Sequence, residues 1–331
     1  MTASSERSTK KRTATLQKIA EEIRSGHRFL ISSHENPEGD ALGSILALGL
    51  ALKQLGKEVS VLNQDPTPEL LSFLPGAEEI VHQVPPDASF DVAFALDCGD
   101  KQRLGEEFIK VQKIGKVINI DHHISNSYFG DINFVDPDAS SAAEIVFDLL
   151  RILRVRLSPG VAENIYAGIL TDTGSFRYSN TSAKTFSVAR ACLLAGVKPW
   201  KVADRVYETQ PLPRLRLLPL VLETLEVTEK GRISWVWVTK KMVDEAGATM
   251  DLTEDFINFP RSLKGVEVAL LLREVSPVQY RVSLRSRGGV DVSRIALAFQ
   301  GGGHPNAAGC TVEGTLSEVK VKVLERVKEA L

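Results

Sequence analysis

Two kinds of segment alternate along the first two thirds of the chain. Short apolar runs of strand length are followed by longer stretches whose apolar residues recur at helical spacing. The short runs predict strands over residues 27–33, 58–64, 91–100 and 116–123, and the longer stretches predict helices over residues 14–25, 39–56, 140–153 and 158–174. Strands that alternate with helices indicate parallel βαβ units. We therefore predict an α/β fold with a mostly parallel sheet flanked by helices.

The pattern changes after a helical, proline-punctuated stretch that ends near residue 222. Three runs, over residues 231–239, 265–275 and 278–288, predict strands with shorter helices between and after them. This arrangement is typical of a smaller C-terminal α+β domain. The predicted organisation is a flexible tail (1–13), a first domain (14–199), a helical connector (200–224) and a second domain (225–331).

Composition narrows the class of protein. The chain has 331 residues, 43% of them hydrophobic and 25% charged, which is typical of a globular protein with two domains. Because no apolar stretch approaches the ~20 residues of a membrane span, we expect no membrane partner. An odd number of widely spaced cysteines, three in all, favours a reducing cytoplasm over a disulfide framework. A formal net charge of only −2 argues against binding of long nucleic acid, which usually requires a clear basic excess.

Acidic residues and histidines gather where the predicted strands and helices end. Taken singly, each has a structural explanation: Asp40 precedes an apolar helix and could cap it, and Asp97 could belong to a turn. Because ligands in open α/β sheets bind at the carboxyl ends of the strands, we expect these residues to converge. The set is His34, Glu38, Asp40, Asp97, Asp121, His122, His123 and Asp172.

Carboxylates with a minority of imidazoles suit a hard or borderline cation. Mn²⁺ or Mg²⁺ fits such a ligand set better than zinc in a thiolate cage. Four or more carboxylates exceed the charge that one divalent ion balances. Two ions ~3.5–4 Å apart, bridged by a carboxylate and a hydroxide, would balance it and would suit in-line attack on phosphorus.

Five motifs carry a resemblance to a known family. In order and spacing, the chain resembles the DHH phosphoesterases, and within them the nano-RNase and pAp-phosphatase subgroup with its DHH-associated C-terminal domain. The motifs are "HENPEGDALGS", "ALDCGD", "NIDHHISN", "GILTDTGSFRYS" and "GGGHPNAAGC".

The resemblance implies a role for each residue of the set. One Mn²⁺ would be held by His34, Glu38 and Asp97. The second would be held by Asp40, Asp97, His122 and Asp172, with Asp97 as the bridge. Asp121 would orient the neighbouring imidazole, and His123 would face the scissile phosphate. Glu38 departs from the family, which usually has Asp there, so the first metal is expected to sit differently or bind more weakly.

Residues of the second domain are implied in substrate binding. The glycine-rich stretch 299–310 could be a turn before a strand or a loop that approaches an anion closely. The resemblance favours contact of Gly301, Gly302, Gly303 and His304 with a terminal nucleotide, although Gln300 replaces the family's first glycine. Arg285, on one face of the strand over 278–288, matches a substrate-binding position of the family.

These expectations combine into one functional hypothesis. The chain is expected to hydrolyse short oligoribonucleotides and pAp (3′-phosphoadenosine 5′-phosphate), with two Mn²⁺ ions, in a cleft between the domains. Two alternatives are a phosphodiesterase for cyclic or linear dinucleotides and a non-catalytic nucleotide-binding regulator. A RecJ-like exonuclease for long DNA is disfavoured by the near-neutral charge. The preferred substrate, the direction of cleavage, the native metal and a homodimeric state remain open.

Overall fold

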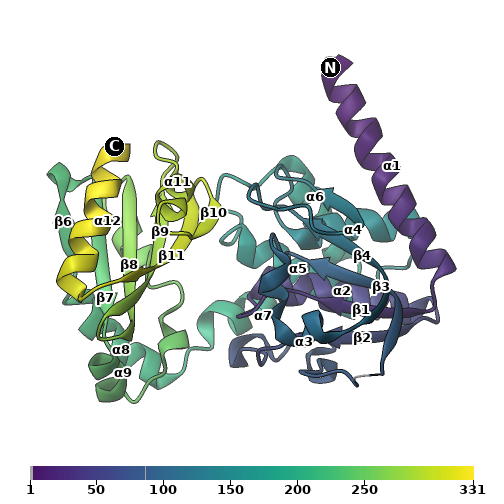
Figure 1. Ribbon diagram of the computed structural model, residues 1–331, viewed down its shortest axis with the longest axis horizontal. Coiled ribbons are helices and arrows are strands. Elements are labelled where there is room, and N and C mark those ends of the chain that lie inside the picture. The colour runs from purple at the N-terminus through teal and green to yellow at the C-terminus, as the bar shows by residue number, and fades with distance from the viewer. Residues whose placement is uncertain (1–2, 86) are drawn as a thin grey trace. The chain divides into compact units, whose positions relative to one another are not determined.

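The computed structural model of the protein describes residues 3–85 and 87–331 (Figure 1). The chain divides into two compact units, of which the first ends at Thr209 and the second spans Gln210–Leu331. The predicted connector, 200–224, is shared between them. Helix α7 (Pro199–Ala203) packs its Val202 into the core of the first unit, whereas α8 (Leu212–Leu222) buries Leu217 and Val221 in the second. Each half of this stretch therefore has its own apolar partner.

The first unit is built on a five-stranded parallel sheet, as the alternation of strands and helices predicts. The strand order is β2-β1-β3-β4-β5. The central strands are short and buried on both faces, which explains their unbroken apolar sequences. The strands are β1 (Arg28–Ser32), β2 (Glu58–Leu62), β3 (Ser89–Leu96), β4 (Lys113–Asp121) and β5 (Ile132–Val135).

The helices of this unit are α1 (Ala3–Ser25), α2 (Gly39–Gln54), α3 (Gly105–Lys110), α4 (Ala142–Leu153), α5 (Pro159–Asp172), α6 (Ala183–Leu194) and α7. Helix α2 is apolar on nearly all sides because it is buried, and it packs closely against α5. Gly43 permits this contact, since a Cβ there would lie 2.5 Å from the carbonyl oxygen of Asn164. A Cβ on Gly39 would likewise lie 2.4 Å from Oγ1 of Thr171. The first turn of α2, which carries Asp40, therefore lies beside the last turn of α5, which ends at Asp172.

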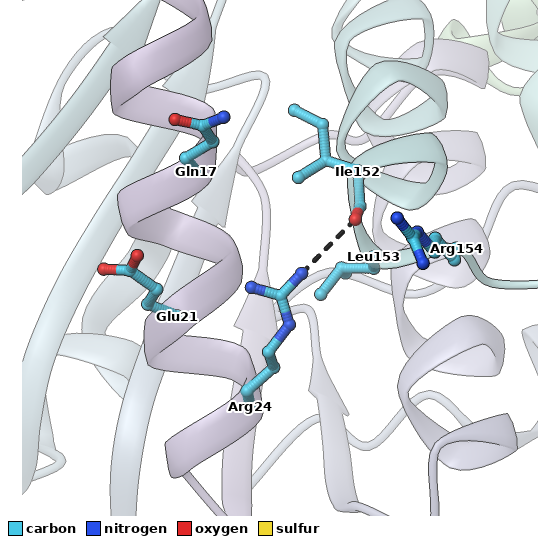
Figure 2. A pocket seen from close by; sticks show the side chains of 6 residues that line it. All are labelled: Gln17, Glu21, Arg24, Ile152, Leu153 and Arg154. Carbon is cyan, nitrogen blue, oxygen red and sulfur yellow. Dashed lines mark hydrogen bonds between the residues drawn. The ribbon is translucent and has the colours of Figure 1, made fainter.

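Helix α1 differs from the prediction at its start. We expected a flexible tail over residues 1–13, but α1 begins at Ala3, and residues 1–2 lie outside the described residues. Arg24 near its end donates a hydrogen bond to the carbonyl oxygen of Ile152, 3.3 Å away, at the carboxyl end of α4 (Figure 2). A pocket of about 610 Å³ opens here, lined by both helices. It is remote from the predicted chemistry, because Asp40 contacts the opposite, amino end of α4.

The second unit has a six-stranded sheet in the order β10-β11-β9-β8-β7-β6, parallel only between β7 and β8. The strands are β6 (Glu226–Thr228), β7 (Ile233–Val238), β8 (Val268–Ser276), β9 (Gln279–Ser286), β10 (Gly302–His304) and β11 (Ala307–Glu313). The helices are α8, α9 (Lys240–Ala246), α10 (Asn258–Ser262), α11 (Val292–Leu297) and α12 (Leu316–Ala330). Two separate apolar clusters, on opposite faces of the sheet, hold these layers together.

None of the helices in the described part of the chain has the length and apolar character needed to cross a bilayer.

Candidate metal centre

The candidate centre lies at the carboxyl edge of the first sheet. Strands β1, β3 and β4 are neighbours and run parallel, so the residues that follow them emerge side by side. His34 follows β1, Asp97 follows β3, and His122 follows β4. The predicted convergence of these three positions is therefore a direct consequence of strand order.

One cluster consists of His34, Glu38 and Asp97, each with a ligand atom within 4.8 Å of the others. His34 Nδ1 lies 2.7 Å from the carbonyl oxygen of Glu35, which leaves Nε2 facing Asp97 Oδ2 at 3.7 Å. Glu38 is the exposed member. It occupies the N-cap of α2 without a capping hydrogen bond from its side chain, so its carboxylate is available to a cation.

A second cluster consists of Asp40, Asp97 and His122, again within 4.8 Å of one another. His122 Nε2 lies 3.4 Å from Asp97 Oδ1, 3.8 Å from Asp40 Oδ2 and 3.9 Å from Asp172 Oδ2. The three carboxylates predicted to hold the second metal therefore surround one ring nitrogen of the fourth predicted ligand, His122. Asp40 also accepts hydrogen bonds from the backbone N–H groups of Ala142 and Ala143, so its carboxylate meets the amino end of α4.

Asp97 belongs to both clusters and is the best indicator of a cation site. It is 1% exposed, and neither of its carboxylate oxygens accepts a hydrogen bond from any described residue. Burying an unpaired carboxylate is costly, so such atoms require an explanation. Its separations of 3.4–3.7 Å from imidazole nitrogens exceed hydrogen-bond length. They match the spacing of two ligand atoms that each bind one ion at about 2.1 Å. The residues present therefore fit divalent cations.

The electrostatics of the two clusters agree with this interpretation. Burial, together with the negative charge of Asp97, raises the pKa of Asp40 well above its usual value. Burial raises the pKa of Asp172 to about 6. Burial alone would also raise the pKa of Asp97, but the imidazoles of His122 and His34 outweigh it and hold that pKa well below normal. Like charges crowd this site, and bound cations would relieve their repulsion.

Asp121 orients His123. The Oδ1 atom of Asp121 lies 2.8 Å from His123 Nδ1 and accepts a hydrogen bond from the backbone N–H of His122. Its Oδ2 atom accepts a hydrogen bond from Asn126 Nδ2 at 2.6 Å. Burial disfavours a charged imidazole, but the Asp121 carboxylate outweighs burial and raises the pKa of His123. The contact with Asp121 thus fixes the orientation of the His123 ring, with Nδ1 directed at the carboxylate.

Three asparagines of the site were not predicted. Asn119 donates to the carbonyl oxygens of Ala95 and Cys98 and accepts from Asn126, which ties the ends of β3 and β4 together. Asn180 donates to Asp172 Oδ2 at 3.1 Å. Asn119 and Asn126 are the first and last residues of the motif "NIDHHISN", and Asn119 is also a polar residue inside an otherwise apolar strand.

The second unit carries the predicted substrate contacts on two of its strands. Arg285 lies on β9 and is half-buried, and Gly302, Gly303 and His304 form β10. Two of the glycines leave no room for a side chain. A Cβ on Gly301 would lie 2.2 Å from the carbonyl oxygen of Gly309, and a Cβ on Gly303 would lie 2.4 Å from the carbonyl oxygen of Ala307. A Cβ on Gly302 would have no heavy atom within 4 Å. Gly302 is therefore the glycine of this stretch whose surface is open.

Comparisons with known proteins agree with this fold. The model of the DHH family N-terminal domain matches residues 28–169, and that of the DHHA1 domain matches residues 236–331. The chain is 40% identical to the bifunctional oligoribonuclease and PAP phosphatase NrnA of Thermus thermophilus, over 91% of this chain and 89% of that protein. It is 29% identical to the probable bifunctional oligoribonuclease and PAP phosphatase NrnA of Streptococcus mutans, over 88% and 91%.

A solved structure resembles both units together. The crystal structure of an exopolyphosphatase-related protein from Bacteroides fragilis has a TM-score of 0.86 and 29% identity, and the match covers 96% of each chain. The parallel sheet with acids and histidines at its carboxyl edge and the two matched domains together place the chain among two-domain phosphoesterases. The chain belongs to the DHH family of phosphoesterases, in the group that joins a DHH domain to a DHHA1 domain.

Proposed function

We propose that the protein is a metal-dependent phosphoesterase that hydrolyses short oligoribonucleotides and pAp. The observation that carries the proposal is Asp97, a buried carboxylate that accepts no hydrogen bond from the described residues and belongs to both ligand clusters. The substrates are supported by relatives of similar length that are named oligoribonucleases and PAP phosphatases. Their names are consistent with the near-neutral charge of this chain, which disfavours long polyanions.

In this proposal two Mn²⁺ ions occupy the two clusters, with Mg²⁺ as the alternative. His34, Glu38 and Asp97 would hold one cation, and Asp40, Asp97, His122 and Asp172 would hold the other. The chemistry that such a pair supplies is a water of lowered pKa as the nucleophile and neutralisation of negative charge on the phosphate.

His123 and Asp121 act on the other side of the reaction. His123 Nδ1 is engaged by Asp121, so Nε2 is the ring nitrogen that can face a substrate. We assign to it a hydrogen bond to the leaving oxygen and transfer of its proton as the phosphorus–oxygen bond breaks. Asp121 keeps the ring in this orientation and stabilises its positive form.

Recognition of the substrate is assigned to the second unit. Arg285 can grip a phosphate through its planar guanidinium. The open backbone at Gly302, with the neighbouring His304, suits contact with a terminal nucleotide. Because positive charge is balanced by negative charge along the chain, longer substrates are expected to gain little affinity, so two to five nucleotides is the favoured length.

A cytoplasmic location is also part of the proposal. It is supported by Cys98, Cys192 and Cys310, which are all buried and free of disulfides.

A substrate panel tests the function. We would compare kcat/KM in Mn²⁺ for pAp, a diribonucleotide, a pentamer, a 24-mer and a cyclic dinucleotide. The proposal expects the dinucleotide, the pentamer and pAp to be preferred, with a steep fall for the 24-mer. Preference for the cyclic dinucleotide would assign the phosphodiesterase alternative. Binding of nucleotides without turnover of any of them would indicate a regulator and overturn the proposal.

A further inference from the structure

Residues 139–143, which run from the loop after β5 into the first turn of α4 and are called the 139–143 loop below, contact two residues of the second cluster directly. The carbonyl oxygen of Ala139 lies 3.3 Å from His122 Nδ1, on the side of the ring opposite the carboxylates. The backbone N–H groups of Ala142 and Ala143 donate to Asp40 Oδ2 and Oδ1 at 2.6 and 2.9 Å. One short stretch of backbone therefore sets the orientation of an imidazole and of a carboxylate.

Asn180 links the third residue, Asp172, to the same loop. Its Nδ2 atom donates to the carbonyl oxygen of Ser140 at 3.0 Å and to Asp172 Oδ2 at 3.1 Å. It also lies 3.2 Å from the backbone oxygen of Asp172. Three oxygens around one amide nitrogen determine how the side chain is turned, because the reverse orientation would place its own oxygen against all three.

The chain between Asp172 and Asn180 takes an unfavourable path to make this link. Gly174, Ser175 and Phe176 all have left-handed backbones, with φ of 53°, 61° and 61°. Such conformations are costly for residues with side chains, and most of all for bulky ones. Consecutive residues of this kind persist where surrounding contacts demand them, and the turn they form returns the chain to Asp172.

The loop itself is held firmly. Ser140 Oγ donates to Glu144 Oε2 at 2.6 Å, and Thr185 Oγ1 donates to the same oxygen at 3.0 Å. Lys184 Nζ lies 3.1 Å from Glu144 Oε1. Glu144 is buried and lies in the first turn of α4, so the loop is anchored to both α4 and α6. A residue attached to this loop is attached to a rigid support.

Asp172 needs such support more than Asp40 does. It ends α5, where the helix dipole places partial negative charge, whereas Asp40 meets the positive amino end of α4. We propose that Asn180 is a positioning residue that holds the Asp172 carboxylate against the 139–143 loop, so that the second cluster is assembled before a cation binds. The inference rests on the proposed metal centre and does not depend on which phosphate ester is hydrolysed.

Titration calorimetry of Mn²⁺ into the metal-free protein tests this role. Asn180→Ala should weaken one Mn²⁺ site by about 10–100-fold, as is typical for partners of metal ligands. The site that contains His34 and Glu38 should keep its affinity. Excess Mn²⁺ should restore most of the turnover, since no ligand is removed. Asn180→Leu keeps the volume of the side chain but removes the hydrogen-bond donor, and it should weaken Mn²⁺ binding at this site as much as Asn180→Ala does.

Asn133→Ala provides a matched control. Asn133 is also half-buried and exchanges two hydrogen bonds with the Gly130 backbone, but it lies at the amino end of β5, away from the clusters. The Asn133→Ala substitution should lower the melting temperature without changing the Mn²⁺ affinity of either site. If Asn180→Ala binds both ions like wild type, or if Asn180→Leu restores the affinity, Asn180 is not a positioning residue. If the wild type binds Mn²⁺ at both sites but does not hydrolyse RNA, only the proposed function is refuted.

Discussion

Replacement of Asp97 by asparagine is the sharpest test of the shared ligand. The two side chains have the same shape, and Asn adopts the left-handed backbone found here (φ 51°) as readily as Asp does. The substitution therefore removes negative charge without adding backbone strain or a cavity. It also places an amide where two carboxylate oxygens face His34 and His122 at 3.7 and 3.4 Å.

The expected loss follows from the position of Asp97 in both clusters. Partners of metal ligands are typically worth ~10–100-fold in affinity or activity, and a direct ligand is worth more. One change that weakens two sites at once should lower kcat by at least ~10³-fold, which corresponds to about 4 kcal/mol in activation free energy. Mn²⁺ affinity should fall at both sites, unlike the single-site effect expected at Asn180.

The assay is hydrolysis of a diribonucleotide across a range of Mn²⁺ concentrations, with circular dichroism to verify folding. Asp100→Asn is the matched control, because this exposed carboxylate lies three residues further along and only accepts a hydrogen bond from the Gln102 N–H. It should retain kcat within about twofold, because the asparagine oxygen can accept the same hydrogen bond and the residue belongs to neither cluster. An Asp97→Asn variant that retains more than about a tenth of the wild-type kcat, a barrier change of only ~1.4 kcal/mol, would refute the bridging role.

Four further predictions follow from the two units. Glu38→Gln should raise the Mn²⁺ concentration needed for half-maximal activity while Glu38→Asp stays close to wild type, and identical titrations for all three proteins would show that Glu38 binds no metal. Arg285→Ala should cost about 1–3 kcal/mol, mainly through KM; unchanged dinucleotide kinetics would contradict the assignment. Gln300→Gly should raise the melting temperature, because it removes a glutamine with a left-handed backbone (φ 58°). The free energy of unfolding should increase by about 0.5 kcal/mol after the entropic cost of glycine, and a lower melting temperature would argue against strain there. Mn²⁺ at ~100 times its Kd should stabilise the protein by about 2.7 kcal/mol for each site that it fills, relative to EDTA, and should raise the melting temperature. Equal melting temperatures would mean that no ion binds.

The main architecture was predictable because it depends on local patterns. The buried strands β1, β3 and β4 are recognisable in the sequence as apolar runs. Their alternation with helices predicts the parallel sheet that the structure has. The four-residue edge strand β5 was not predicted, since a short strand leaves little pattern. The boundary between the units follows Thr209, inside the stretch 200–224 that was predicted as a connector. The proline-punctuated helical pattern did not show which half belongs to which unit, because that depends on the two apolar cores.

The residues of the candidate site were predictable, but their supports were not. Acids and histidines at strand ends are visible in the sequence, and sheet topology then brings them together. The backbone amides that meet Asp40 belong to residues about a hundred positions away, and any residue type could supply them. The glycines of the second unit were noticed in the sequence, but one reason for them was not. The resemblance favoured contact with a terminal nucleotide, and the structure shows in addition that the close approach of β10 to β11 leaves no room for a side chain at Gly301 or Gly303.

The two carboxylates beside His122 differ in a way that bears on how the second cluster works. Asp40 is 1% exposed and has two backbone donors at a helix amino terminus, so it is held with or without a cation. The side chain of Asp172 is 22% exposed, lies at a helix carboxyl terminus, and receives a side-chain donor in Asn180. Asp172 is therefore the less firmly held of the two carboxylates. Asp172 is then the ligand expected to move first when the ion leaves, and the hydrogen bond from Asn180 is the contact that opposes this movement.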